Sequence, residues 1–179
     1  MAVAPICTRR LQWCHGHRLV GHEGKCVRPH GHNYVGHFHC EGALDGVGRV
    51  VDFSVIKQRI GGWIEDHWDH GFVVFDQDTL MIDLLEDFAK RSPGGASKSF
   101  RLPANPTAEN LALYLLNTVC PAVLVETGVR CVRVDLEETE NCSATATLAM
   151  DAPFSGLPPL GMEFQARFRT ALELLRSQQ

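Results

Sequence analysis

The sequence predicts an α+β domain in which helices cover one face of an antiparallel sheet. Two stretches near the start of the chain alternate apolar and polar residues, as half-buried strands do. Two segments in the middle carry apolar residues at helical spacing, and alternation returns between residues 129 and 150. Strands at both ends with helices between them favour a single sheet that is backed by helices.

The first two strands are expected over residues 8–19 and 30–42. A loop over residues 20–29 joins them, and the turn signal DGVG at 45–48 follows the second strand. We interpret the pair as an antiparallel hairpin with a functional loop. One face of the first strand carries Leu11, Trp13, His15, His17 and Leu19.

Two main helices are expected in the middle of the chain. Ser54 is the expected N-cap of the first helix, and Thr107 is the expected N-cap of the second, which runs to about Val119. Apolar spacing places one face of the first helix on Ile56, Ile60, Trp63, Ile64 and His67.

Shorter elements complete the pattern. Residues 68–78 predict a loop with a short strand, residues 79–91 a short helix, and residues 91–100 a flexible connector. A strand is expected over residues 129–138, with residues 143–150 as a further strand candidate. The face of the 129–138 strand carries Val132, Val134, Leu136 and Glu138. An amphipathic helix is expected over residues 162–177.

Composition narrows the class of protein. The chain has 179 residues and a formal net charge of −4, and its basic residues are scattered, which argues against a nucleic-acid binder. There is neither an apolar stretch of membrane-spanning length nor a signal peptide at the start, so we expect a cytoplasmic protein without a membrane partner. Seven cysteines without a C-x-x-C pair favour reduced thiols over disulfides.

Seven of the nine histidines fall between residues 15 and 39, and this cluster predicts a metal site. His30 and His32 are separated by one residue in a strand, so both side chains point to one face, about 7 Å apart. His17 on the neighbouring strand is placed to supply a third imidazole. Three neutral imidazoles leave one position of a tetrahedral zinc open, which is the catalytic pattern.

Other residues of the cluster have alternative interpretations. Cys26 is either a fourth ligand, which would make the zinc structural, or a free thiol that acts as a base or nucleophile. His37 and His39 fall on the opposite strand face and are interpreted as structural. His15 shares a face with His17 and is a candidate to support that ligand from behind.

Six short motifs, in this order, resemble the 6-pyruvoyltetrahydropterin synthase family, which includes 6-carboxytetrahydropterin synthases. Together they span most of residues 10–145, and six in order are far more specific than any one alone. The motifs are WCHGHRL (13–19), CVRPHGHNY (26–34), VVDF (50–53), WDHGF (68–72), NPTAEN (105–110) and ETEN (138–141).

The resemblance implies the tunnelling fold, an antiparallel four-stranded sheet with two main helices on one face. It implies that subunits join their sheets into a barrel as a homo-oligomer, a dimer of trimers, with active sites between subunits. Residues 1–179 are then a single domain, with an insertion around 79–104 and a C-terminal helical extension at 151–179.

The resemblance also assigns roles residue by residue. The zinc ligands of the family fall on His17, His30 and His32. The catalytic cysteine falls on Cys26, and the Asp-His pair falls on Asp69 and His70. The glutamate that anchors the pterin falls on Glu138, where its carboxylate meets the 2-amino group and ring N–H of the substrate.

The implied reaction is a lyase reaction on 7,8-dihydroneopterin triphosphate. The spacing C-x-x-x-H-G-H resembles the branch that makes 6-carboxy-5,6,7,8-tetrahydropterin, acetaldehyde and triphosphate in queuosine biosynthesis. Two alternatives stay open: triphosphate elimination to the 6-pyruvoyl product, and a non-catalytic structural zinc module. Four basic residues are candidates to bind the triphosphate: Arg9, Arg10, Lys25 and Arg28.

Overall fold

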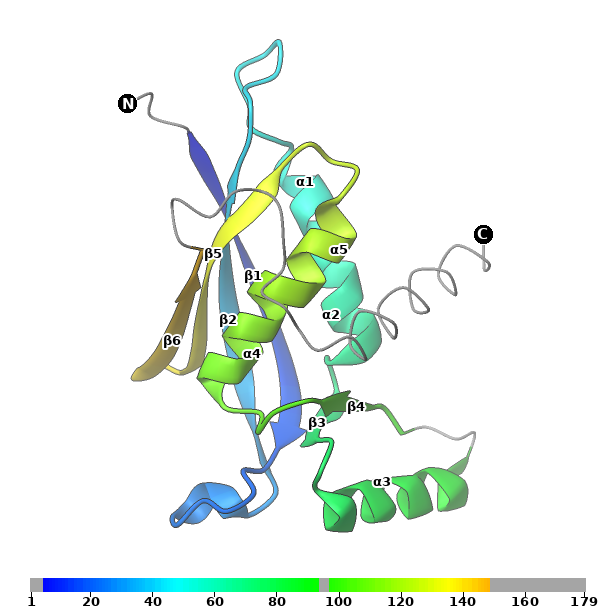
Figure 1. The fold of residues 1–179 in the computed structure, drawn as a ribbon. Helices are drawn as coiled ribbons and strands as arrows, with labels where there is room; N and C mark the ends of the chain where they lie inside the picture. The colour runs from blue at the N-terminus through cyan, green and yellow to red at the C-terminus, as the bar shows by residue number, and fades with distance from the viewer. Residues whose placement is uncertain (1–4, 94–96, 149–179) are drawn as a thin grey trace. The chain divides into compact units, whose positions relative to one another are not determined.

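The hairpin predicted at the start of the chain is present in the structure, a computed structural model that describes residues 5–93 and 97–148. β1 (Ile6–His17) and β2 (His30–Glu41) pair antiparallel over their whole lengths. β5 (Arg130–Thr139) pairs antiparallel with β2, and β6 (Cys142–Thr147) pairs antiparallel with β5. These four strands form the antiparallel part of the sheet (Figure 1).

The sheet that the structure describes has two strands more than the four that the family resemblance predicted. β3 (Gly71–Phe75) pairs parallel with β1 at His15 and Gly16, and β4 (Ser99–Leu102) pairs parallel with β3. The six strands in the described residues therefore run in the order β4-β3-β1-β2-β5-β6. The segment predicted as a flexible connector contains the start of β4, which is reached through a helix, as parallel neighbours require.

A β-bulge changes which residues of β5 face the core. His39 pairs with Arg133, but Cys40 pairs with Cys131, so β5 has one extra residue at Val132. Cys131 is consequently buried and Val132 only half-buried, whereas strict alternation predicted Val132 on the core face. Beyond the bulge the prediction is confirmed, because Val134 and Leu136 are fully buried.

The first helical segment runs from Phe53 to His67 as α1 (Phe53–Ile56), a π-helical stretch over Lys57–Gly61 and α2 (Gly62–His67). Its N-cap is Asp52 and not Ser54 as predicted. The Asp52 carboxylate accepts hydrogen bonds from the Ser54 backbone N–H at 2.8 Å and from the Ser54 hydroxyl at 2.6 Å. Ser54 therefore contributes to the cap from inside the helix.

The second helical segment begins where predicted and ends later. The Thr107 hydroxyl accepts from the backbone N–H of Asn110, which caps α4 (Ala108–Tyr114). A π-helical stretch over Leu115–Val119 and then α5 (Cys120–Leu124) continue the segment past the predicted end at Val119. Pro121 lies at the start of α5, directly after the π-helical stretch, and does not interrupt the segment.

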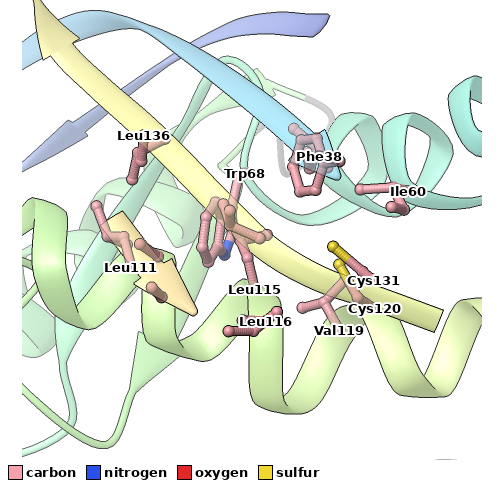
Figure 2. Close-up of a cluster of buried hydrophobic side chains, with 14 of the residues drawn as sticks. Phe38, Ile60, Trp68, Leu111, Leu115, Leu116, Val119, Cys120, Cys131 and Leu136 are labelled. Carbon is pink, nitrogen blue, oxygen red and sulfur yellow. The ribbon is translucent and has the colours of Figure 1, made fainter. Parts of the chain in front are cut away.

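Both helical segments lie against the same face of the sheet and enclose the core between the two layers (Figure 1). In Figure 2, Phe38 and Leu136 of the sheet lie in the same cluster as Ile60 and Leu115 of the helices. Each side chain of this size contributes about 1.5–3 kcal/mol when fully buried. The cluster is large enough to fix the face of β1 and β2 that also carries the histidines.

α3 (Thr79–Arg91) is connected to the histidine end of β1 by a buried ion pair. Arg18 directly follows β1 and donates two hydrogen bonds to Asp78, from Nε at 2.5 Å and from Nη2 at 2.6 Å. The Asp78 side chain is 2% exposed and also caps α3 by accepting from the Met81 backbone N–H. These hydrogen bonds, above all those from Arg18, hold the pKa of Asp78 below its usual value.

We expect Asp78→Ala to lower the free energy of unfolding at pH 7 by about 3 kcal/mol, because it leaves the Arg18 guanidinium without its partner. A lowered folded-state pKa contributes stability above the unfolded value near 4, and this contribution is lost as the pH falls through the folded-state pKa. Denaturant unfolding at pH 7 and at pH 3 measures both effects. The exposed Asp83 on the same helix provides the control, Asp83→Ala, which should change stability by less than about 0.5 kcal/mol. An equal loss for Asp78→Ala at both pH values would contradict the ionic explanation.

The predicted C-terminal helix over residues 162–177, and the extension at 151–179 that contains it, lie outside the described residues. Within residues 5–93 and 97–148, no helix has the length and apolar character needed to cross a bilayer.

Candidate metal centre and active site

The antiparallel register of β1 and β2 brings three histidines together. His17, the last residue of β1, pairs with His30, the first residue of β2, and His32 follows on the same face. The ring centroids are 4.5 Å apart for His17 and His30, 5.3 Å for His17 and His32, and 5.0 Å for His30 and His32. One ring nitrogen from each residue lies within 4.8 Å of the others. This is the arrangement that one metal ion requires.

Hydrogen bonds to backbone carbonyls orient two of the three rings. Nδ1 of His17 lies 2.7 Å from the Pro106 carbonyl oxygen, and Nδ1 of His30 lies 2.7 Å from the Arg28 carbonyl oxygen. A carbonyl only accepts, so each Nδ1 carries the proton and each Nε2 keeps its lone pair for a metal. Burial lowers the pKa of His17, which favours the neutral form that metal binding needs.

Glu138 lies beside the three histidines, where the apolar face of β5 ends. Its Oε1 is 3.6 Å from Nε2 of His17 and 4.0 Å from Nε2 of His32, and its side chain is 24% exposed. The Tyr34 hydroxyl donates to the same Oε1 at 3.2 Å. The carboxylate is thus held against the candidate metal site while it stays open to solvent.

Tyr34 is a site residue that the sequence analysis did not single out. It is fully buried, and burial together with the charge of Glu138 raises the pKa of its hydroxyl well above the usual value. The phenol therefore stays protonated and donates. Its position two residues after His32 on one strand face was the available signal.

His15 lies behind Tyr34 and does not belong to the metal cluster. Its ring stacks on Tyr34 with centroids 4.2 Å apart and an interplanar angle of 8°. The indole N–H of Trp13 donates to Nδ1 of His15 at 3.0 Å, and burial lowers the pKa of His15 to about 3. His15 is therefore a neutral core residue that supports the phenol, whereas sequence analysis considered it as support for His17.

Cys26 lies in the loop between β1 and β2, in a short helical turn over Lys25–Val27. The turn is fixed to the end of β1, because the Leu19 N–H donates to the Cys26 carbonyl oxygen at 2.8 Å. The Cys26 thiol does not belong to the group of ligand atoms that the three histidines form. It is nevertheless near enough to Tyr34 to raise the pKa of the Tyr34 hydroxyl. In this structure Cys26 therefore lies beside the candidate site and not in the group of atoms that converge there.

Asp69 and His70 form an ion pair at a separate place, beside Cys14. Nδ1 of His70 lies 2.9 Å from Oδ2 of Asp69, and the Cys14 backbone N–H donates to Oδ1 at 2.9 Å. Burial raises the pKa of Asp69, but the hydrogen bonds from Cys14 and His70 outweigh it and hold this pKa below the usual value. Within one chain, the side-chain ligand atoms of these two residues and of Cys14 lie within 4.8 Å of one another, in a group separate from that of the three histidines.

The backbone of His70 is in the left-handed region, with φ of 58°, which is uncommon for a residue with a side chain. The His70 N–H donates to the Cys14 carbonyl oxygen at 2.8 Å and helps to hold this conformation. The resulting side chain is 80% exposed. The imidazole is therefore presented to the outside of the chain, where a partner or substrate can meet it.

His37 and His39 point to the opposite face of β2, as strand alternation predicted. Nε2 of His37 lies 3.0 Å from Glu137, and Nε2 of His39 lies 2.7 Å from Asp135. Both histidines are thus paired with acids of β5, on the face away from the metal cluster and the helices.

Comparison with known proteins agrees with the motifs. The sequence profile of the 6-pyruvoyl tetrahydropterin synthase family matches residues 6–148, which is most of the chain. The chain belongs to this family. The six motifs that indicated the family in the sequence all fall within the matched residues.

Relatives within the family share a more specific name. A protein of Rickettsia bellii named 6-carboxy-5,6,7,8-tetrahydropterin synthase is 35% identical over 137 residues, which cover 76% of this chain and 95% of the relative. A protein of Halobacterium salinarum named probable 6-carboxy-5,6,7,8-tetrahydropterin synthase is 38% identical over 129 residues, which cover 72% of this chain and 77% of the relative.

Two solved structures share the fold of this chain. An uncharacterized protein from Wolinella succinogenes superimposes with a TM-score of 0.68 at 22% identity, covering 83% of this chain and 100% of that one. The 6-pyruvoyl tetrahydropterin synthase of Caenorhabditis elegans superimposes with a TM-score of 0.55 at 23% identity, with the same coverage. The α+β class predicted from the sequence is confirmed by the elements of this chain and by these two matches.

Proposed function

We propose that the chain is a zinc-dependent 6-carboxy-5,6,7,8-tetrahydropterin synthase. Its substrate is 7,8-dihydroneopterin triphosphate, which reacts with water to give 6-carboxy-5,6,7,8-tetrahydropterin, acetaldehyde and triphosphate. The observation that carries the proposal is the convergence of three imidazoles beside the Glu138 carboxylate. The shared name of the relatives and the C-x-x-x-H-G-H spacing support this product over the 6-pyruvoyl product.

The donor set fits zinc. The ligand atoms are three imidazole nitrogens, two of them with the tautomer fixed by a carbonyl. Among the described residues, no carboxylate or thiol belongs to this group of atoms within 4.8 Å of one another. Such a set leaves a coordination position open, as catalytic zinc sites do. When bound, the metal supplies Lewis acidity that makes carbons next to coordinated hydroxyl groups more acidic.

Side chains of the protein bind the pterin and transfer protons. Glu138 anchors the pterin, because its carboxylate accepts two hydrogen bonds from the 2-amino group and the ring N–H in a bidentate pair. Cys26 removes a proton from the side chain of the substrate. His70, oriented by Asp69, gives or relays a proton, since a carboxylate fixes the imidazole and supports its charged form.

We further propose that the active site is completed between subunits of a homo-oligomer, a dimer of trimers. The separation of Asp69 and His70 from the three histidines within one chain supports this arrangement, as does the exposure of the His70 imidazole. In the described residues β1 pairs with β3 only at His15 and Gly16, so most of β1 has an open edge on that side, and β6 ends the sheet. Both edges can pair with another copy.

The setting that fits this chemistry is the cytoplasmic synthesis of queuosine, for which the carboxylated pterin is the precursor. Incubation of the zinc-loaded protein with 7,8-dihydroneopterin triphosphate tests the function directly. Mass analysis should find 6-carboxytetrahydropterin, with acetaldehyde released in equal amount. A pterin that keeps all side-chain carbons would instead identify the 6-pyruvoyl reaction, and an unchanged substrate would contradict both.

A further inference from the structure

Two exposed cations, Lys25 and Arg28, lie on either side of Cys26 in the loop that leads to the metal ligands. In the described part of the chain, neither has a carboxylate within 4.0 Å, whereas many other arginines do. Their charges are therefore available to a ligand that approaches the site from solvent.

Hydrogen bonds hold the backbone of Lys25 and Arg28 in place next to the candidate metal site. The Arg28 N–H donates to the Lys25 carbonyl oxygen at 3.1 Å, and the Leu19 N–H holds the Cys26 carbonyl oxygen at 2.8 Å. The carbonyl oxygen of Arg28 accepts from the imidazole of His30 at 2.7 Å. The backbone that carries the two cations is therefore held by hydrogen bonds next to the candidate site, and one of these bonds orients His30.

The other two basic candidates from the sequence lie at the far end of the hairpin. Arg10 pairs with His37 in the register of β1 and β2, seven residues before His17 along β1. At about 3.4 Å per residue this is about 24 Å from the metal ligands. Arg9 is its neighbour at the same end of the strand. Within one chain, neither can reach a substrate that is anchored at Glu138.

We propose that Lys25 and Arg28 bind the triphosphate group of the substrate, an inference that rests on the proposed function. The pterin is held at Glu138 and its side chain passes the three histidines, so the triphosphate extends to the Cys26 loop. A guanidinium matches phosphate oxygens in a bidentate geometry, and an ammonium adds a mobile point charge. Because of these two cations, the protein binds the triphosphate ester more tightly than the unphosphorylated pterin.

Inhibition by inorganic triphosphate tests the proposal. Lys25→Gln and Arg28→Gln should each raise the inhibition constant of triphosphate and the KM of the substrate by about tenfold, and the double variant by more. Arg10→Gln is the matched control, since it removes one charge at the far end of the same strand pair. Binding of unphosphorylated 7,8-dihydroneopterin and the metal content should stay unchanged in all variants.

The outcomes separate this inference from the proposed function. If wild-type protein turns over the substrate but triphosphate inhibits the double variant and Arg10→Gln equally well, the inference is wrong and the function stands. Equal weakening of triphosphate and unphosphorylated pterin would also overturn it, because that result indicates a distorted loop. If calorimetry shows that triphosphate binding depends on both cations while no turnover occurs, the anion site stands and the proposed reaction fails.

Discussion

Cys26→Ala is expected to bind about one zinc per chain, as the wild type does, and to lose turnover by a factor of about 10²–10⁴. The reason is that the thiol lies in the loop beside the site and is not among the ligand atoms that converge at the three histidines. Metal analysis after dialysis and product analysis with 7,8-dihydroneopterin triphosphate measure the two properties on the same preparation.

A second cysteine provides the control. Cys142 is exposed at the start of β6, and its thiol is not among the ligand atoms that converge at the three histidines, so Cys142→Ala should keep both zinc and turnover. Loss of zinc from Cys26→Ala would instead show that the thiol is a ligand. The chain would then be a closed structural zinc module, the alternative that the sequence left open.

His32→Ala is expected to lose the metal and, with it, all measurable turnover. Two imidazoles remain after the substitution, and His17 and His30 alone cannot provide the three-nitrogen set. Zinc titration against a chelating indicator measures the change in zinc affinity. We expect a loss of at least about a hundredfold, because removing only the hydrogen-bond partner of a metal ligand already lowers metal affinity by about 10–100-fold.

The matched control for His32→Ala is His37→Ala on the same strand. His37 points to the opposite face and pairs with Glu137, so its removal takes away an imidazole without touching the cluster. It should leave zinc affinity unchanged. If both variants lost metal equally, the effect would come from damage to β2 and not from a lost ligand.

The alternation of apolar and polar residues was enough to predict β1, β2 and the convergence of His17, His30 and His32. Strand pairing in adjacent segments is local, and the two-residue periodicity determines which side chains share a face. The same reasoning correctly placed His37 and His39 on the other face. Periodicity was therefore sufficient wherever both strands were regular.

It was insufficient where the structure depends on distant contacts. The short strand predicted within residues 68–78 is present as β3, but its parallel pairing with β1 at only two positions was not predicted. β4 has only four residues, so its pattern does not stand out from a loop. The bulge at Val132 shifts the core face by one residue, and no residue type in the sequence signals it. At the helix start, Asp52 and Ser54 are both good caps, and only the backbone geometry separates them.

The site shows a similar division. Residue chemistry predicted the imidazole cluster, but the roles of Cys26, Asp69, His70 and Glu138 came from the resemblance to the family. The structure places Glu138 against the histidines and leaves Asp69 and His70 apart from them in one chain. A single sequence cannot predict that separation, because it depends on the hydrogen bonds that hold Asp69 and His70 beside Cys14, which is far away in the sequence.

X-ray absorption at the zinc edge of the loaded protein tests the central claim most directly. The account predicts a first shell of nitrogen and oxygen atoms only, at about 2.0–2.1 Å, from three imidazoles and one exchangeable ligand. A sulfur atom at about 2.3 Å would place Cys26 on the metal and contradict the account.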